Sequence, residues 1–336
     1  MFYYITLYNF LQENPLLLFS CKMHKILHRQ KGKLVLIMGK TGLVVEGGGM
    51  KCAYNAGILD RFLDEGIHFD YCIGVSAGSA NVGSYLAGQR GRNLRFYTQH
   101  TTLPEYMGVR NFLHTGQFFG LQFIYGTMTN STGIDPIDYP AIMANPSEYE
   151  LVATDAGTGE ATYFNKYDLK QDDYTAIMAS CALPALCRPV PYNGHLYYDG
   201  GVADSIPVER AFAQGCDRVV VILSNPRSYV KQKEGLRFAY APLLRKYPKL
   251  LAAVDNRHLM YRKNIADVNS HEKDGNAFVF APTIDHDLSA FCKDAKTEQQ
   301  LYDLGVQNFN DQLCSLKQFL QLDTQSDHLT DDCQNK

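Results

Sequence analysis

The sequence predicts an α/β fold with three layers, in which helices cover both faces of a mainly parallel central sheet. Short β-branched and aromatic runs alternate with helical patterns from about residue 42 onward, which is typical of parallel sheets. Two glycine-containing turns, at 47–49 and 74–78, each connect a buried-looking strand with a helix. No linker, repeat or low-complexity run interrupts the alternation, so we expect one main domain in the 336 residues.

Six short apolar runs are predicted to be strands: Leu43–Glu46, Tyr71–Val75, Glu150–Thr154, Leu196–Asp199, Arg218–Leu223 and Ala277–Ala281. Helical patterns lie between or after them at 50–65, 77–88, 172–181, 207–214 and about 294–320. The first helix keeps small residues on one side, so it can pack closely against the sheet. Gly66 is a natural residue for its C-terminal end.

The domain boundaries follow from composition. Residues 1–38 form an apolar N-terminal extension that polar residues interrupt, so we expect neither a signal peptide nor a transmembrane helix. This extension is either poorly ordered or associated with a surface, and Met23 or Met38 would serve as alternative starts. The main domain is expected over 40–285, a helical segment packed on it over 286–322, and a frayed polar tail over 323–336.

An aromatic-rich stretch at 91–145 does not follow the alternation. Its rings have weak periodicity: Phe96, Tyr97, Tyr106, Phe112, Phe118, Phe119, Phe123 and Tyr125. Long inserts in α/β enzymes often cover the site, and an aromatic cap would suit an apolar substrate. The alternative is that these rings fill a subsidiary core, and the sequence leaves both interpretations open.

Composition limits the partners and the compartment. The formal net charge of −3 provides no basic field for nucleic acid, so we expect no nucleic-acid partner. The nine cysteines are scattered and form no C-x-x-C pair. This pattern favours reduced, mostly buried thiols over a disulfide framework, and therefore a cytoplasmic location.

The segment Gly74-Val75-Ser76-Ala77-Gly78 has the G-x-S-x-G pattern and lies between a predicted strand and a predicted helix. A sharp strand-to-helix turn holds a serine hydroxyl clear of the sheet. The flanking glycines remove Cβ atoms that would collide there, and the helix N-terminus supplies a positive dipole. Ser76 is therefore predicted to be a nucleophile.

The glycine run Gly47, Gly48, Gly49 follows the first strand and allows backbone N–H groups to approach a negative group. A dinucleotide loop would need a third spaced glycine where Cys52 stands, and a phosphate-binding P-loop would need Gly-Lys-Ser/Thr. An oxyanion hole beside Ser76 remains. Lys51 either adds positive charge there or is simply solvated.

A serine nucleophile needs a proton acceptor. Asp199 ends a predicted strand and precedes Gly200 and Gly201, where catalytic groups of α/β folds gather, although Asp-Gly is also common in ordinary turns. The sequence alone leaves these two interpretations equal. Four histidines follow late enough to complete a triad, and solvated or packed surface positions are expected for all of them: His195, His258, His271 and His286.

Together these motifs resemble the patatin-like phospholipases, a family of lipid acyl hydrolases. The matching blocks are "EGGGMKCAYNAG", "GVSAGS", "ASCALPALCRPVPYNG", "YYDGGVADSIPV" and "VVVILS", in family order over about 40–225, with a weaker match to about 320. The resemblance implies a patatin-like variant of the α/β-hydrolase architecture. It assigns Ser76 as nucleophile, Asp199 as general base without a histidine, and Gly47–Gly49 as oxyanion hole.

The same resemblance makes the neighbouring motif residues supporting positions: Lys51, Gly74, Gly78, Gly200 and Gly201. Two residues depart from the family pattern, because Cys52 stands where glycine is usual and Lys51 where arginine is commoner. Neither supplies the nucleophile, the base or the glycine amides, so both departures are expected to be tolerated.

The resulting expectation is a serine hydrolase for fatty-acyl esters of lipids, of phospholipase A or lysophospholipase type, with no metal and no organic cofactor. Acyl transfer, or a conventional Ser-Asp-His esterase for soluble esters, is the alternative, and a non-catalytic binding protein is a third. A lipid substrate would also bring peripheral contact with the inner membrane surface, although no basic amphipathic helix is evident in the sequence.

Overall fold

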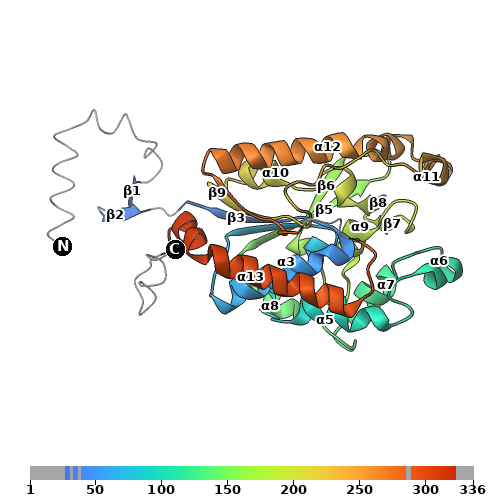
Figure 1. The fold of residues 1–336 in the computed structure, drawn as a ribbon, viewed down its shortest axis with the longest axis horizontal. Coiled ribbons are helices and arrows are strands. Elements are labelled where there is room, and N and C mark those ends of the chain that lie inside the picture. The colour runs from blue at the N-terminus through green and yellow to red at the C-terminus, as the bar shows by residue number, and fades with distance from the viewer. Residues whose placement is uncertain (1–26, 31–32, 37–38, 285–288, 323–336) are drawn as a thin grey trace. The chain divides into compact units, whose positions relative to one another are not determined.

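The computed structural model describes residues 27–30, 33–36, 39–284 and 289–322 (Figure 1). The chain divides into two compact units, Met1–Lys40 and Thr41–Lys336. In the first unit, β1 (Leu27–Gln30) pairs antiparallel with β2 (Lys33–Leu36). The rest of the predicted N-terminal extension and the predicted polar tail lie outside the described residues.

An eight-stranded sheet forms the centre of the second unit, in the order β10-β9-β3-β4-β5-β8-β7, with β6 paired to β5. The strands are β3 (Thr41–Val45), β4 (Tyr71–Val75), β5 (Glu148–Asp155), β6 (Ala161–Asn165), β7 (Val190–Tyr192), β8 (His195–Asp199), β9 (Arg218–Ile222) and β10 (Ala277–Phe280). From β10 to β5 all neighbours are parallel, and β6, β7 and β8 pair antiparallel. The prediction of a mainly parallel sheet is confirmed. β6 and β7 were not predicted.

Helices cover both faces of this sheet, which confirms the three layers. Figure 1 shows α10 (Val208–Ala213) and α12 (Pro248–Lys273) above it, and α3 (Ala53–Asp64), α5 (Arg92–Thr98) and α13 (Ala295–Leu320) below it. The other helices of the second unit are α4 (Ala77–Leu86), α6 (Val109–Thr115), α7 (Leu121–Phe123), α8 (Tyr139–Ala144), α9 (Thr175–Cys181) and α11 (Arg237–Leu244). Shorter turns are η2 (Gly49–Cys52), η3 (His100–Thr102), η4 (Ile124–Met128), η5 (Lys166–Asp168) and η6 (Gly200–Val202).

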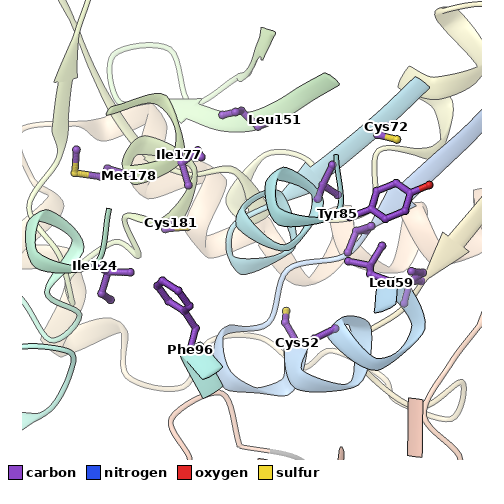
Figure 2. Packing of buried hydrophobic residues seen from close by; sticks show 14 of the residues in the cluster. Cys52, Leu59, Cys72, Tyr85, Phe96, Ile124, Leu151, Ile177, Met178 and Cys181 are labelled. Atoms are coloured by element: carbon purple, nitrogen blue, oxygen red, sulfur yellow. The ribbon is translucent and has the colours of Figure 1, made fainter. Parts of the chain in front are cut away.

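Each face of the sheet has its own hydrophobic core, because successive strand residues point to opposite sides. In β3, Leu43 and Val45 belong to the larger cluster beside α3, whereas Val44 belongs to the smaller cluster beneath α10 and α12. Figure 2 shows part of the larger cluster, in which Leu59 from α3, Tyr85 from α4 and Leu151 from β5 are buried.

The five predicted helices are present, with small shifts at their ends. The helix expected at 50–65 starts as the 3₁₀ turn η2 and continues as α3, and Gly66 follows it with a φ of 61°. The long helix α12 and the shorter α11 were not predicted. Among the described helices, none combines the length and the apolar character needed to cross a bilayer.

Residues 91–145 form α5 to α8 with the turns η3 and η4 between them. Four of the eight aromatic rings in this stretch are buried in the larger cluster: Phe96, Tyr97, Tyr106 and Phe119. Among the cysteines that the structure describes, six are not disulfide-bonded, and five of these are buried. Cys314 of α13 is disulfide-bonded, whereas the sequence predicts reduced thiols.

Candidate active site

The position of the site follows from how two strands share one edge of β5. β4 runs parallel to β5 and ends with Val75 opposite Val152. β8 runs antiparallel to β5 and ends with Asp199 opposite Ala153, the next residue along. Both strands occupy the same edge, because β6 pairs with the other edge over the same stretch. The two strands therefore meet end to end, and Ser76 and Asp199 lie together where they meet.

Ser76 lies in a strained turn between β4 and α4. Its φ of 53° and ψ of −132° are unusual for a residue with a side chain. The Ser76 N–H donates to Ser180 Oγ at 2.9 Å, and the Ser76 carbonyl accepts from the Ser79 hydroxyl at 2.6 Å. At Gly74 a Cβ would lie 2.6 Å from Ser79 N, and at Gly78 it would lie 2.6 Å from the Glu46 carbonyl oxygen. Both glycines are therefore required by close packing of the turn.

Asp199 is 1% exposed, and its two carboxylate oxygens differ. Oδ1 accepts a hydrogen bond from the Gly201 N–H at 2.8 Å, whereas Oδ2 has no hydrogen-bond partner of normal geometry among the described residues. Burial raises the pKa of Asp199, and Arg257, the nearby Ser76 hydroxyl and the Gly201 N–H partly offset this rise. Ser76 is thus a neighbour of the carboxylate without an aligned hydrogen bond, a common situation in unliganded sites.

Gly200 and Gly201 allow the chain to turn tightly after Asp199. A Cβ at Gly200 would collide with the Val152 carbonyl oxygen of β5. The Gly201 carbonyl is held from two sides, by Arg257 Nε at 2.6 Å and by Ser205 Oγ at 2.8 Å. Arg257 belongs to α12, so this unpredicted helix supports the turn that carries Asp199.

The glycine run packs directly against the serine turn. A Cβ at Gly47 would lie 2.7 Å from the Val75 carbonyl oxygen and 2.8 Å from Ser76 Cβ. The next amide along, that of Met50, already donates to the Ala290 carbonyl at 3.1 Å. Within the described chain, the N–H groups of Gly47, Gly48 and Gly49 donate no hydrogen bond. These amides are thus available to a negative oxygen beside Ser76.

A buried polar network supports this loop from below. Glu46 is 3% exposed, and its carboxylate accepts from the Ser224 N–H, the Asn225 amide and the Tyr261 hydroxyl. Burial raises the pKa of Glu46, and Lys51 and these hydrogen bonds partly offset the rise. Lys51 Nζ donates to Asn225 Oδ1 at 2.6 Å, so it is part of the network and not merely solvated.

Cys52 is fully buried at the end of the 3₁₀ turn. Its thiol lies 3.6 Å from the Glu46 carbonyl oxygen and 3.4 Å from Ser224 Oγ. Burial raises its pKa to about 12, so the thiol is neutral. Cys52 therefore acts as a small packing residue in this structure.

Two hollows adjoin Ser76. A cavity of about 330 Å³ extends from Ser76 and Asp199 past the glycine run to Arg257, Tyr240 and Phe291. A smaller pocket of about 60 Å³ lies beside Ser76 and is lined mainly by aromatic and aliphatic side chains from the 91–145 stretch and α9. Phe96, Ile124 and Cys181, which line this pocket, come from three separate elements (Figure 2).

No histidine among the described residues lines either hollow. His195 Nδ1 lies 2.8 Å from Asp155 Oδ2 at the surface, and His271 Nε2 lies 2.8 Å from Glu209. His258 lies on α12, where its Nδ1 is buried without a partner among the described groups. His286 lies outside the described residues.

Comparison with known proteins identifies the family. The model of the patatin-like phospholipases matches residues 43–212, which is half of the chain and includes the glycine run, Ser76 and Asp199. The chain therefore belongs to the patatin-like phospholipase family. A second model, described as a domain of unknown function (DUF6363), matches residues 247–321. This second segment contributes Arg257, Tyr261 and Phe291 to the larger cavity.

Three curated relatives are similar to the patatin segment. The protein YjjU of Escherichia coli, described as uncharacterized, is 29% identical over 56% of this chain and 53% of its own length. A patatin-like phospholipase domain-containing protein of Caenorhabditis elegans is 26% identical over 52% of this chain and 13% of its own. The lysophospholipase NTE1 of Yarrowia lipolytica is 25% identical over 54% and 12%.

The chain thus spans about half or less of the length of these relatives. Among solved structures, VipD from Legionella pneumophila is similar with a TM-score of 0.40 and 10% identity, over 85% of this chain and 70% of its own.

Proposed function

We propose that this protein hydrolyses fatty-acyl esters of lipids, of phospholipase A or lysophospholipase type, with Ser76 as nucleophile and Asp199 as general base. The observation that carries the proposal is the end-to-end meeting of β4 and β8 on β5, which brings these two side chains together. Family membership and the lysophospholipase name of one relative support the lipid substrate.

In the proposed reaction, the Ser76 oxygen attacks the ester carbonyl carbon while its proton passes to Asp199 Oδ2. The oxyanion that forms accepts hydrogen bonds from the amides of Gly47–Gly49. Collapse breaks the bond to the alcohol, which takes the proton from Asp199 and leaves an acyl-enzyme. Water then attacks the acyl group, Asp199 accepts the proton from water, and the fatty acid departs as Ser76 regains its hydrogen.

The electrostatics favour this assignment. A carboxylate with an ordinary pKa is a weak base for a serine hydroxyl, and burial raises the pKa of Asp199 toward the working range. The free Oδ2 is the oxygen that can accept the Ser76 proton. The unused amides of the glycine run would stabilise the transition state, each by about 3–4 kcal/mol where such donors have been removed in other enzymes.

The two hollows match the two ends of an amphipathic ester. The smaller pocket is lined by rings such as Phe96, Tyr97 and Phe119, and suits an acyl chain. The larger cavity contains Lys51, Lys231 and Arg257 alongside acidic groups, and suits the polar part of the substrate. Phospholipid and lysophospholipid are accordingly the proposed substrate class.

The test compares Ser76→Ala with Ser131→Ala, an exposed serine far along the chain. We expect Ser76→Ala to lose hydrolysis of phosphatidylcholine, lysophosphatidylcholine and p-nitrophenyl esters by at least about 10³-fold, together with labelling by a fluorophosphonate probe. Asp199→Asn should be nearly as damaging. Retained activity in Ser76→Ala would refute Ser76 as the nucleophile. Loss of ester hydrolysis in the single variant His258→Ala would favour a histidine-containing triad.

A further inference from the structure

Exposed apolar side chains are concentrated in one part of the molecule. Twelve large hydrophobic residues are exposed in the described part of the chain. Eight of them belong to α6, to α11 with the loop before it, or to residues 289–294: Val109, Phe112, Leu113, Val230, Leu236, Phe238, Leu243 and Phe291. Single exposed apolar residues are ordinary on a soluble protein, but a concentration of this kind marks an interaction surface.

This surface adjoins the mouth of the larger cavity. On α11 the side chain of Tyr240 is buried and lines the cavity, whereas Phe238 and Leu243 are 79% and 59% exposed. Phe291 lines the cavity and is itself 44% exposed. Its ring packs on Phe118, which follows α6, with centroids 5.4 Å apart. Figure 1 shows α6 and α11 at the same end of the second unit.

α6 is the more unusual of the two helices. None of its seven residues is buried, although Val109 and Leu113 are 67% and 76% exposed. A short helix gains little stability from its own backbone. The described chain leaves most of the Val109 and Leu113 side chains uncovered, so α6 presents them outward.

Positive charge accompanies the apolar residues. Between residues 227 and 249 the sequence has seven basic residues and one acidic residue, in a chain of formal net charge −3: Arg227, Lys231, Lys233, Arg237, Arg245, Lys246 and Lys249 against Glu234. Four of these cations are exposed and form no ion pair with a described residue: Lys233, Arg245, Lys246 and Lys249.

We propose that α6, α11 and the basic segment 227–249 form a docking surface for an anionic lipid bilayer. Outward aromatic and aliphatic residues interleaved with unpaired Lys and Arg are the composition of membrane-surface helices. A second copy of the chain would bring the same cations against each other, and the cores of protein interfaces are depleted in lysine. This inference rests on the proposed function, because docking of the surface would present the mouth of the cavity to the lipid substrate.

The closing experiment measures binding without hydrolysis, in full-length Ser76→Ala protein. Sedimentation with vesicles of phosphatidylcholine alone and of phosphatidylcholine with phosphatidylglycerol gives the partition coefficients. The apolar variant is Leu113→Ser with Phe238→Ser, and its matched control is Ile134→Ser with Tyr167→Ser, two residues exposed by 65% and 73% outside the surface. The charge variant is Arg245→Gln with Lys246→Gln. Its matched control is Lys170→Gln with Lys273→Gln, two exposed lysines outside the surface.

We expect the apolar variant to lower partitioning about tenfold on both vesicles, and the charge variant to remove most of the preference for phosphatidylglycerol. Both control variants should bind as the parent does. Equal losses in variant and control, or no loss in either variant, would overturn the proposal. A dimer that dissociates in the apolar variant while vesicle binding stays unchanged would overturn it too, by assigning the surface to a second copy.

The same variants on the active background separate this inference from the proposed function. They should lose hydrolysis of vesicle phospholipid and retain hydrolysis of a soluble p-nitrophenyl ester. Vesicle binding by a protein that hydrolyses no ester would refute the function alone. Hydrolysis that needs Ser76 but not the docking surface would refute the surface alone.

Discussion

Asp199 combines one oxygen that is fixed with one that is free. The Gly201 N–H holds Oδ1, and Arg257 of α12 in turn holds the Gly201 carbonyl, so this helix supports the backbone that orients the carboxylate. An unpartnered oxygen on a buried carboxylate costs stability. Under the proposed roles this oxygen is kept unpaired because Ser76 must deliver a proton to it.

Arg257 is predicted to set the acidic limit of activity. Its charge lowers the pKa of Asp199 against the rise caused by burial, and Asp199 must be ionised to act as a base. Arg257→Met should therefore raise that pKa and move the acidic limb of the kcat/KM profile to higher pH, by about one unit. Activity should recover as the pH is raised further.

The measurement is a pH–rate profile on a soluble ester, so that membrane binding does not enter. Arg262→Met is the matched control, because Arg262 lies on the same helix and bonds the Lys231 carbonyl away from Asp199. An acidic limb that stays in place in Arg257→Met would show that Arg257 does not act through the Asp199 carboxylate.

Gly47→Ala is predicted to lower turnover. The new methyl group would press on the Val75 carbonyl oxygen and on Ser76 Cβ, and so move the glycine amides away from the serine. We expect kcat to fall about 10²-fold or more with a small change in KM. Gly235→Ala is the control, because a Cβ there meets nothing within 4 Å. Full activity in Gly47→Ala would contradict an oxyanion role for the loop.

The sequence was informative for residues that belong to contiguous motifs. Ser76, Asp199 and the glycines each stand in a short window beside a strand, so local pattern alone could single them out. Arg257 could not be found this way, because it reaches Gly201 from a helix more than fifty residues further along. No local pattern distinguishes it from the other cations on α12, and only the packing of that helix gives it a function.

Elements were predictable where their apolar pattern was strong. All six predicted strands and all five predicted helices are present. β7 has only three residues, and β6 has five residues with a mixed apolar and polar sequence. Neither strand therefore has a marked apolar run. α12 buries only five of its 26 residues, which leaves most of its length polar. Its narrow stripe, with Leu250, Val254 and Tyr261, has helical spacing and is an indication of the helix in the sequence of this segment.

The antiparallel direction of β8 was not predictable from its own residues. A five-residue apolar strand carries no information about direction. The short β7–β8 connection, in which Tyr192 pairs with His195, fixes β8 antiparallel to β7 only, and its direction relative to β5 depends on how the pair of strands packs into the sheet. The sequence nevertheless predicts Asp199 as a site residue, because that prediction depends on its place at the end of β8 and not on the direction of the strand.

Helix α13 carries a buried acid that should make stability depend on pH. Glu298 is 0% exposed, and neither of its oxygens has a hydrogen-bond partner of normal geometry among the described residues. Burial raises its pKa from 4.5 to about 8. Its contribution to stability is therefore fully present below pH 4.5 and is lost as the pH rises to about 8.

Over that interval the free energy of unfolding should fall by up to about 1.4 kcal/mol per pH unit relative to Glu298→Gln. Urea unfolding of both proteins across pH 5 to 9 measures the difference. Glu234→Gln, an acid that is 36% exposed, is the control and should follow the wild-type slope. Parallel curves for wild type and Glu298→Gln would show that Glu298 is not buried as the neutral acid.

At the scale of the whole molecule, the two family segments are joined by a close helix crossing. A Cβ at Gly57 of α3 would collide with the Tyr302 carbonyl oxygen, and one at Gly305 of α13 would collide with the Tyr54 carbonyl oxygen. The backbones of the two helices are thus in direct contact. Because α13 also covers the larger core, the patatin segment and the segment of unknown function should unfold together.

Gly305→Ala is predicted to destabilise the protein by about 1–3 kcal/mol, although alanine favours helices over glycine by about 1 kcal/mol. The methyl group would force α3 and α13 apart. Thermal or urea unfolding should remain a single transition at a lower midpoint. Gln300→Ala, an exposed position on the same helix, should change little. A more stable Gly305→Ala protein, or two separate transitions, would contradict this crossing as the joint between the segments.

The strand β5 fixes the positions of the ends of β4 and β8, because both strands pair with it. The distance between Ser76 and Asp199 depends on the register of Val152 and Ala153, and not on the length of chain between them. The insert at 91–145 can therefore lengthen, shorten or change sequence without altering that spacing. One residue added to β5 between Val152 and Ala153 would instead shift Asp199 by about 3.3 Å and reverse the faces of the following residues. This division leaves the walls of the pocket free to diversify in evolution while the reacting pair stays in place.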